Sequence, residues 1–310
     1  MYSYSIIGNR KFRATSAMTW LAIVLLLGAP FAGATVQEVE TIEKTFTTAG
    51  VPEIFVRNVD GRTQLTAHAG NEVLVRAVKE VRRADNQAEA EEVARKVSVR
   101  IEQVDNRIEV ETKYPKNFSW GRGPQVYVHI EISAPERSNA DVKSVDGNLT
   151  VTGIEGQLQL KTVDGDLAVT DCSGEIHAGS VDGDAELRGV SGTIEARTVD
   201  GNLEIDGILG GIRAKSTDGD IAIRVHTDSV MNADWSIATT DGSIRVELPD
   251  GFGVNLDVRV SDGNIESDHP LTVEGKISDH RLQGALYGGG HQLSIRTSDG
   301  SVELRKSSMD

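Results

Sequence analysis

The sequence predicts an all-β protein, a parallel β-solenoid with 18-residue coils, plus one short helix in the N-terminal part. Asp-Gly preceded by Val, Thr or Ser occurs nine times in the chain. From Asp146 to Asp218 these pairs recur every 18 residues. A further glycine falls midway between them and divides each coil into two nine-residue halves: Gly156, Gly174, Gly192 and Gly210.

Aligned units contain six almost purely apolar columns separated by polar ones, which is typical of strands with one buried face. The inward positions step by two, three and four residues in each half. This spacing disfavours the left-handed hexapeptide helix, whose inward positions recur every six residues. The columns are Leu149/Leu167/Ala185/Leu203/Ile221, Val151/Val169/Leu187/Ile205/Ile223, Ile154/Cys172/Val190/Ile208, Leu158/Ile176/Ile194/Ile212, Leu160/Ala178/Ala196/Ala214 and Val163/Val181/Val199/Thr217.

Residues 1–34 are predicted to be a signal peptide. Arg10, Lys11 and Arg13 precede an apolar run at 17–29, which is shorter than the roughly 18 residues of a membrane span. Ala32-Gly33-Ala34 then supplies the small residues of a cleavage site. An uncleaved N-terminal anchor is the alternative. We expect an exported protein, periplasmic or at the cell surface, with no membrane span in its mature chain.

The mature chain, 35–310, is predicted to form a single β-solenoid domain. Its regular coils occupy about 144–225, and irregular coils with a cap occupy about 226–310. A helix is expected to be inserted at about 84–96, where Ala, Glu and Arg fill the body and Asp85 is the candidate N-cap.

Composition excludes several functional classes. The 32 Lys and Arg against 47 Asp and Glu give a net charge of −15, which argues against nucleic acid and anionic membrane surfaces as partners. The single cysteine excludes an intramolecular disulfide, and no Cys/His spacing matches a zinc site. We expect no cofactor.

Three segments resemble the bacterial "putative adhesin" repeat-domain family of exported proteins. They are residues 46–80, residues 144–169 (SVDGNLTVTGIEGQLQLKTVDGDLAV) and residues 288–304 (GGGHQLSIRTSDGSVEL). The shared motif is Asp-Gly or Asn-Gly before an alternating strand. The resemblance covers nearly the whole mature chain. It implies a β-solenoid at the cell surface or in the envelope, and it supplies no catalytic residues.

The Asp-Gly pairs are interpreted first as structural corners, because Gly tolerates positive φ and Asp accepts hydrogen bonds from nearby backbone N–H groups. Calcium is the alternative, with Asp164, Asp166, Asp182 and Asp184 as candidate ligands on adjacent coils. Calcium rolls, however, place a glycine doublet and an Asp in every half-turn. The second corner of this repeat lacks that pattern.

Other repeated side chains are assigned structural roles. The hydroxyl column Ser144/Thr162/Ser180/Thr198/Ser216 is expected to satisfy backbone groups at strand ends, with an ice- or glycan-facing ladder as the alternative. Cys172 lies in an apolar column and should be buried. The histidines show no metal-ligand spacing, and Glu195 with Arg213 makes only an ordinary surface pair. We therefore predict no catalytic residues.

The least repetitive stretch is residues 114–123, YPKNFSWGRG. Tyr114, Phe118, Trp120 and Arg122 combine aromatic and cationic side chains in a loop, a composition typical of recognition surfaces. The alternative is a loop that covers an open end or strand edge of the solenoid.

Together these observations predict a non-catalytic, exported structural or interaction module of the bacterial envelope. Its partner would be an envelope protein or glycan. The alternatives are an enzyme that acts on envelope polysaccharide and a calcium-stabilised extracellular β-roll.

Overall fold

The computed structural model of the protein describes residues 22–23, 37–116, 118, 123–270, 272, 278 and 280–307. The predicted signal peptide lies outside them, apart from Ala22–Ile23, which pair antiparallel with β2 as β1. The described chain is all-β, with one helix and mostly parallel strand pairing, as predicted. None of its helices is long and apolar enough to cross a membrane.

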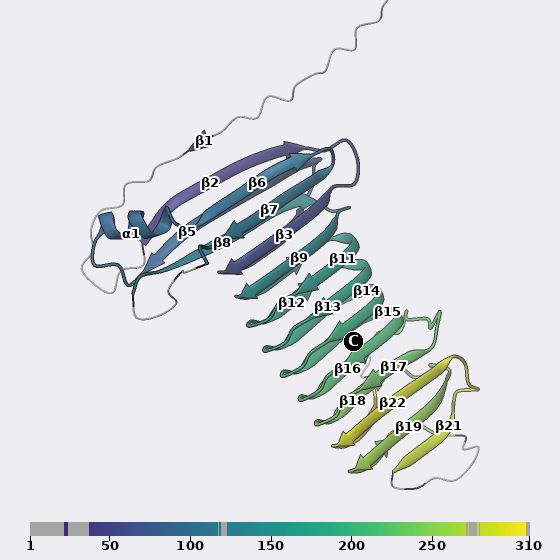
Figure 1. Cartoon of the computed structure of the whole chain (residues 1–310). Coiled ribbons are helices and arrows are strands. Elements are labelled where there is room, and N and C mark those ends of the chain that lie inside the picture. Colours follow the sequence, from purple (N-terminus) through teal and green to yellow (C-terminus); the bar gives the residue numbers. More distant parts are fainter. Residues whose placement is uncertain are drawn as a thin grey trace, which may run out of the picture.

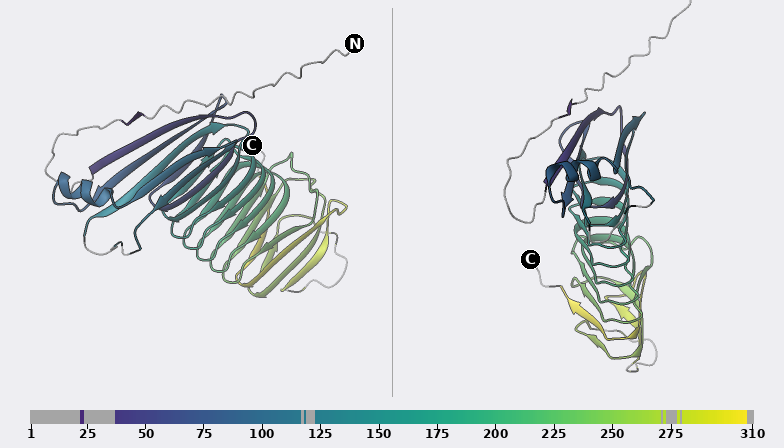
Figure 2. Two further views of the ribbon diagram at one scale, coloured as in Figure 1. Left: turned by 45° about the horizontal axis from the view of Figure 1, so that its top comes forward. Right: turned by 60° about the vertical axis from the view of Figure 1, so that its left-hand side comes forward.

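Two faces of paired strands run along the molecule and form a stack of rungs (Figures 1 and 2). The first face pairs in the order β2–β5–β8–β4–β10–β12–β14–β15–β16–β18–β23–β20. The second face pairs in the order β6–β7–β3–β9–β11–β13–β14–β15–β17–β22–β19–β21. The long strands β14 and β15 contribute to both.

The N-terminal strands are β2 (Gln37–Thr47), β3 (Glu53–Asp60), β4 (Thr63–His68), β5 (Glu72–Arg82), β6 (Ser98–Val104), β7 (Arg107–Lys113) and β8 (Gln125–Pro135). The strands of the stack are β9 (Asn139–Asp146), β10 (Leu149–Thr152), β11 (Glu155–Lys161), β12 (Leu167–Thr170), β13 (Ser173–Gly179), β14 (Ala185–Arg197), β15 (Leu203–Lys215), β16 (Ile221–Val225), β17 (Trp235–Ala238), β18 (Ile244–Leu248), β19 (Val254–Asp262), β20 (Ile265–Ser267), β21 (Arg281–Leu286), β22 (Gln292–Asp299) and β23 (Val302–Lys306).

Parallel pairing aligns the apolar columns. Leu149 pairs with Leu167, Leu167 with Ala185, and Ala185 with Leu203, so each partner lies 18 residues further along the chain. All four side chains are buried. Burying a Leu or Val side chain contributes about 1.5–3 kcal/mol, and stacking places these contributions in one continuous core.

The prediction that the sixth column is buried is wrong. Val145, Val163, Val181 and Val199 (the valine line) are 40–43% exposed, and Thr217 is exposed as well. The preceding hydroxyl residues point inward instead, and three of the five satisfy a corner carbonyl. Thr162 Oγ1 donates to Gly147 O at 3.3 Å and Ser180 Oγ to Gly165 O at 3.1 Å. Ser216 Oγ donates to Gly201 O at 3.3 Å, whereas Thr198 Oγ1 donates to Ser216 Oγ at 3.0 Å and the buried Ser144 Oγ has no partner among the described residues. The structural role predicted for the hydroxyl column is therefore confirmed for three of its five residues.

A second correction concerns Ile208, which is 41% exposed although its column was predicted to be buried. The register between β14 and β15 shifts there, so that Val190 pairs with Gly207. Leu209 fills the core in place of Ile208 and is fully buried.

The last coils do not stack in sequence order. Asp241 pairs with Asp299, and Asp299 pairs with Asp262. The C-terminal strands β22 and β23 therefore lie between the coil of β17 and β18 and the coil of β19 and β20 (Figure 1). The antiparallel strand β21 pairs with β19 beyond them.

The helix α1 (Gln87–Ala94) forms within the predicted segment and packs against β2 and β5. Its N-cap is Asn86, whose side chain accepts from Glu89 N, and not Asp85 as predicted. Asp85 instead donates its backbone N–H to the Glu89 carboxylate at 2.7 Å.

Candidate functional site

One edge of the stack carries a line of aspartates. The Asp-Gly corners lie above one another, and each Asp except the first is exposed. The glycines are required. At Gly147, φ is +137° and an added Cβ would lie 2.5 Å from Gly61 O. The aspartate line consists of Asp60, Asp146, Asp164, Asp182, Asp200, Asp218, Asp241, Asp299 and Asp262.

A second polar ladder follows these corners and includes two of the calcium candidates. Asp166 Oδ1 accepts from Asp184 N at 3.2 Å, and Asp184 Oδ1 accepts from Asn202 N at 2.7 Å. These carboxylates therefore join successive coils. Asp164 and Asp182 are neighbours in the aspartate line. Within the described ranges, no three His, Cys, Asp or Glu side chains are arranged to hold a metal ion.

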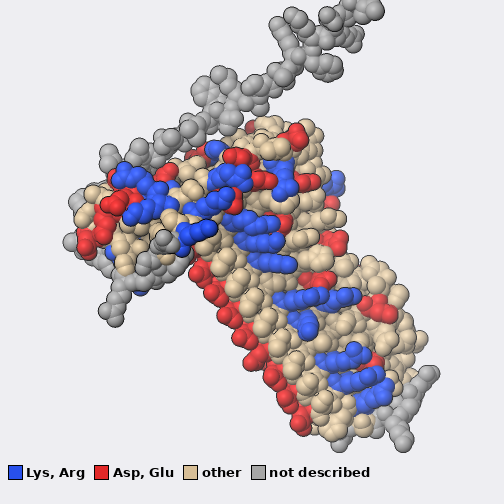
Figure 3. Space-filling view, in the orientation of Figure 1, with Lys and Arg blue, Asp and Glu red and all other residues tan. Residues whose placement is uncertain are grey.

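A line of cations runs beside the aspartate line on the second face, and the sequence analysis missed it. Parallel pairing places one residue per coil in this line, and all but two coils supply Lys or Arg. Figure 3 shows red carboxylates along one edge and blue cations further across the same face. The cationic line consists of Arg57, Lys143, Lys161, Arg197, Lys215, Arg296 and Arg259, interrupted at Gly179 and Ala238.

The cations differ in their partners. Arg57 bonds Asp141 at 2.7 Å, and Arg259 bonds Asp257 at 3.0 Å. By contrast, the ammonium groups of Lys161 and Lys215 are exposed and make no hydrogen bond or ion pair within the described part of the chain. The valine line lies between the cationic and aspartate lines, two residues from the first and one from the second. The face therefore presents cations, exposed apolar side chains and carboxylates in that lateral order.

Gly179 opens a hollow of about 320 Å³ in this face. The missing side chain leaves space between Lys161 and Arg197, and His177 lines the hollow from the neighbouring column. His177 contacts the carboxylates of Glu175 at 3.0 Å and Glu195 at 3.6 Å. The hollow is thus a mixed-charge depression, with the cations of Lys161 and Arg197 and the carboxylate of Glu195 on its walls.

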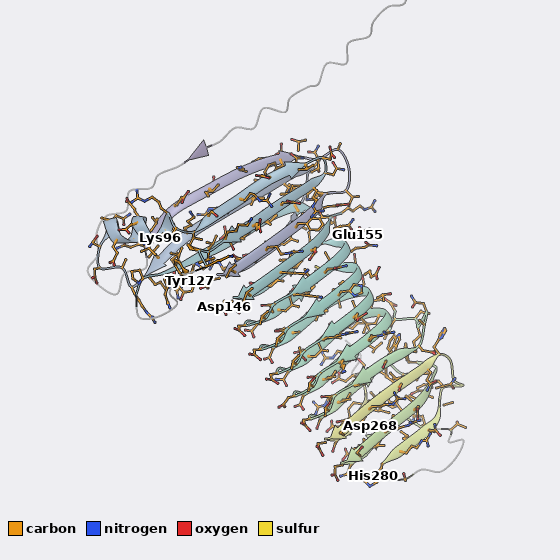
Figure 4. The ribbon with its side chains drawn as sticks, in the orientation of Figure 1. Lys96, Tyr127, Asp146, Glu155, Asp268 and His280 are labelled. Carbon is orange, nitrogen blue, oxygen red and sulfur yellow. The ribbon has the colours of Figure 1, made fainter. Side chains whose placement is uncertain are left out.

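The opposite edge of the stack lacks this arrangement. Figure 4 places Asp146 and Glu155 at the two ends of adjoining strands. Glu155 bonds Arg137 at 3.3 Å across one coil. On the first face, acidic and basic side chains alternate within one column, as in Arg224 with Glu247 at 2.9 Å. On the second face, by contrast, the described strands gather most of their cations into one line.

The predicted recognition loop is described in part. Tyr114 and Phe118 are partly buried against the core and meet edge to face with ring centres 5.3 Å apart. The Tyr114 hydroxyl donates to Val126 O at 2.9 Å, so this side chain is held in place from within. Trp120 and Arg122 lie outside the described residues.

Asp60, the first member of the aspartate line, has a strongly perturbed carboxyl group. Its side chain is only 7% exposed. Burial, together with the nearby charge of Asp146, raises the pKa of Asp60 to about 7, although Arg82 and a hydrogen bond from Gly61 oppose this shift. The Tyr114 ring lies in the same region, and burial followed by the charge of Asp60 raises the pKa of its hydroxyl. Sequence pattern could not separate Asp60 from its exposed equivalents.

Cys172 is buried, as predicted, and burial raises the pKa of its thiol. Its Sγ accepts from Ile154 N at 3.4 Å. Glu195 and Arg213 occupy the outward column predicted for them, but Glu195 bonds Arg197 instead. The described histidines that meet carboxylates do so on separate coils, as with His226 and Asp206 at 3.1 Å.

The search of curated proteins found no match. The chain is similar to the structure of a "putative adhesin" from Bacteroides fragilis, with 12% identity and a TM-score of 0.44 over 86% of this chain and 97% of that one. It is also similar to a "putative lipid binding protein" from Parabacteroides distasonis, with 12% identity and a TM-score of 0.44 over 85% and 96%.

A "putative cell adhesion protein" from Clostridium sporogenes is similar at 12% identity and a TM-score of 0.28, over 86% of this chain and 99% of that one. The family model Toastrack DUF4097 matches residues 77–305, which is most of the sequence. The recognition of an adhesin-like repeat family is confirmed. The chain belongs to the Toastrack DUF4097 family.

Proposed function

We propose that the chain is exported after loss of residues 1–34 and acts in the bacterial envelope as a non-catalytic interaction module. In this proposal residues 35–310 form one β-solenoid domain with 18-residue coils. The observation that carries it is the second face, where side chains of one kind recur coil after coil. A catalytic site needs different groups converging on one point, whereas a repeating surface suits an extended or repetitive partner.

The loop at 114–123 is the proposed contact with an envelope protein or glycan. Tyr114 and Phe118 anchor its start against the core. In this proposal Trp120 and Arg122 supply the contact, because aromatic and Arg side chains dominate most binding energies.

Retention on isolated cell envelopes tests this proposal. Trp120→Ala should reduce retention about tenfold or more while leaving the unfolding midpoint unchanged. Tyr287→Ala is the matched control, because Tyr287 is an exposed aromatic (39%) at the other end of the stack. Equal retention of both variants and the wild type would contradict the proposed contact.

A further inference from the structure

The second face is complementary to itself. Across it lie the cationic line, the valine line and the aspartate line, in that order. In all three lines, successive members are one coil apart, which is about 4.8 Å along the stack. If a second copy faces the first and is related to it by a two-fold axis along the valine line, the order of the lines is reversed. Cations of each copy then face aspartates of the other, at the same height.

We propose that this face docks a second copy of the chain, forming a parallel two-fold dimer with the valine line at its axis. In this dimer Lys161 faces the partner's Asp164, and Lys215 faces the partner's Asp218. Val181 faces its own counterpart. The other two-fold arrangement, with its axis across the coils, would place like charges opposite each other, which costs free energy.

Three observations favour a second copy over an anionic polymer. The aspartate line lies three residues from the cationic line, about 10 Å away, which is close to the Debye length of about 8 Å at physiological salt. A polyanion bound to the cationic line would therefore be repelled by the aspartate line. The valine line would stay exposed under a purely ionic ligand, and Lys161 and Lys215 lack partners within the described structure. A second copy supplies both signs and covers the valines.

The expected dimer is weak. The coils from Lys143 to Arg259 span roughly 38 Å and the lines about 10 Å, which gives about 400 Å² per copy. A standard interface buries about 800 Å² per partner. Exposed ion pairs are also screened by salt. We therefore expect a dissociation constant in the micromolar range or above, and weaker association at 500 mM than at 50 mM salt.

Complementary charge reversal is the primary test. Sedimentation equilibrium of protein purified from the exported fraction should show a dimer for the wild type. Lys161→Asp/Lys215→Asp and Asp164→Lys/Asp218→Lys should each weaken it about 30-fold. Mixing the two variants should restore wild-type affinity, because each altered line then meets its opposite. Thermal melts check that both variants are folded.

A cysteine at the axis tests the geometry. Val181→Cys should form an intermolecular disulfide, since the two copies of this residue face each other. Ala222→Cys is the matched control, exposed on the first face. Cys172 is buried and does not compete. Equal cross-linking of both variants would overturn the proposal.

Two further outcomes would also overturn it. One is a wild-type protein that remains monomeric at 500 μM and 50 mM salt. The other is a monomer that binds polygalacturonate through Lys161 and Lys215, which would assign the cationic line to an acidic polymer. The dimer is independent of envelope retention through Trp120, so either proposal can fail alone.

Discussion

Replacing Asp60 by Asn should stabilise the protein in a strongly pH-dependent way. Asp60 is 7% exposed, and its pKa is raised from 3.8 to about 7, chiefly by burial. The folded state therefore holds a proton that the unfolded state has already released. The stability contributed by this group is complete below about pH 4 and is lost as pH rises toward 7. Each pKa unit corresponds to 1.36 kcal/mol, so the loss is roughly 2–4 kcal/mol.

Urea unfolding of the wild type and Asp60→Asn measures this difference directly. Asn is nearly isosteric and uncharged, so it should raise the free energy of unfolding by roughly 2–4 kcal/mol at pH 7.5 and by less than about 1.5 kcal/mol at pH 4.5. Asp200→Asn, exposed in the same line, should change it by less than about 0.5 kcal/mol at both. A gain at Asp60 that is equal at the two pH values would refute the buried charge as its cause.

Further predictions concern the core, the corners, the thiol and calcium. Val169→Asp buries an unpaired charge and should unfold the protein, whereas the exposed Glu204→Lys should shift stability by less than about 0.5 kcal/mol in urea; equal tolerance would contradict the register. Gly147→Ala should lower the free energy of unfolding by about 1–3 kcal/mol, because φ is +137° and Gly61 O is close; an unchanged midpoint would exclude this strain. Cys172 should react slowly with a thiol reagent in native protein and rapidly in urea, and fast native labelling would place it at the surface. Calcium at millimolar concentration should shift the melting temperature little relative to chelator, and a rise of many degrees would instead support the calcium roll.

The repeat could be predicted from sequence because parallel stacking demands equivalent residues at equal spacing. Leu149, Leu167 and Leu203 needed only an 18-residue alignment to be placed in one line. The outward position of Val163 is what strict alternation from Leu158 and Leu160 predicts, but the apolar character of the valine favoured an inward assignment. Thr162 takes the inward position instead, where its hydroxyl donates to the corner carbonyl of Gly147. At these two adjacent positions, burial of the apolar side chain therefore competes with satisfaction of the backbone carbonyl.

The charged face of the candidate site was missed for a different reason. A net charge of −15 describes the whole chain, but folding gathers cations into one line. Gly179 interrupts that line, and irregular spacing after Asp218 hides its continuation to Arg296 and Arg259. The sequence also does not show which coils are neighbours at the C-terminal end, because the strand edges of successive coils are alike and do not specify their partners.

The placement of β22 and β23 has a consequence for folding during synthesis. These strands separate two coils that precede them in the chain. A chain that emerges with its N-terminus first can stack its coils in order only as far as β18. The segment that contains β19 and β20 cannot join the stack until residues 292–306 have been synthesised and inserted. Until then its apolar residues stay uncovered. Completion of the stack is therefore a late event, because β22 and β23 are inserted between coils that are synthesised before them.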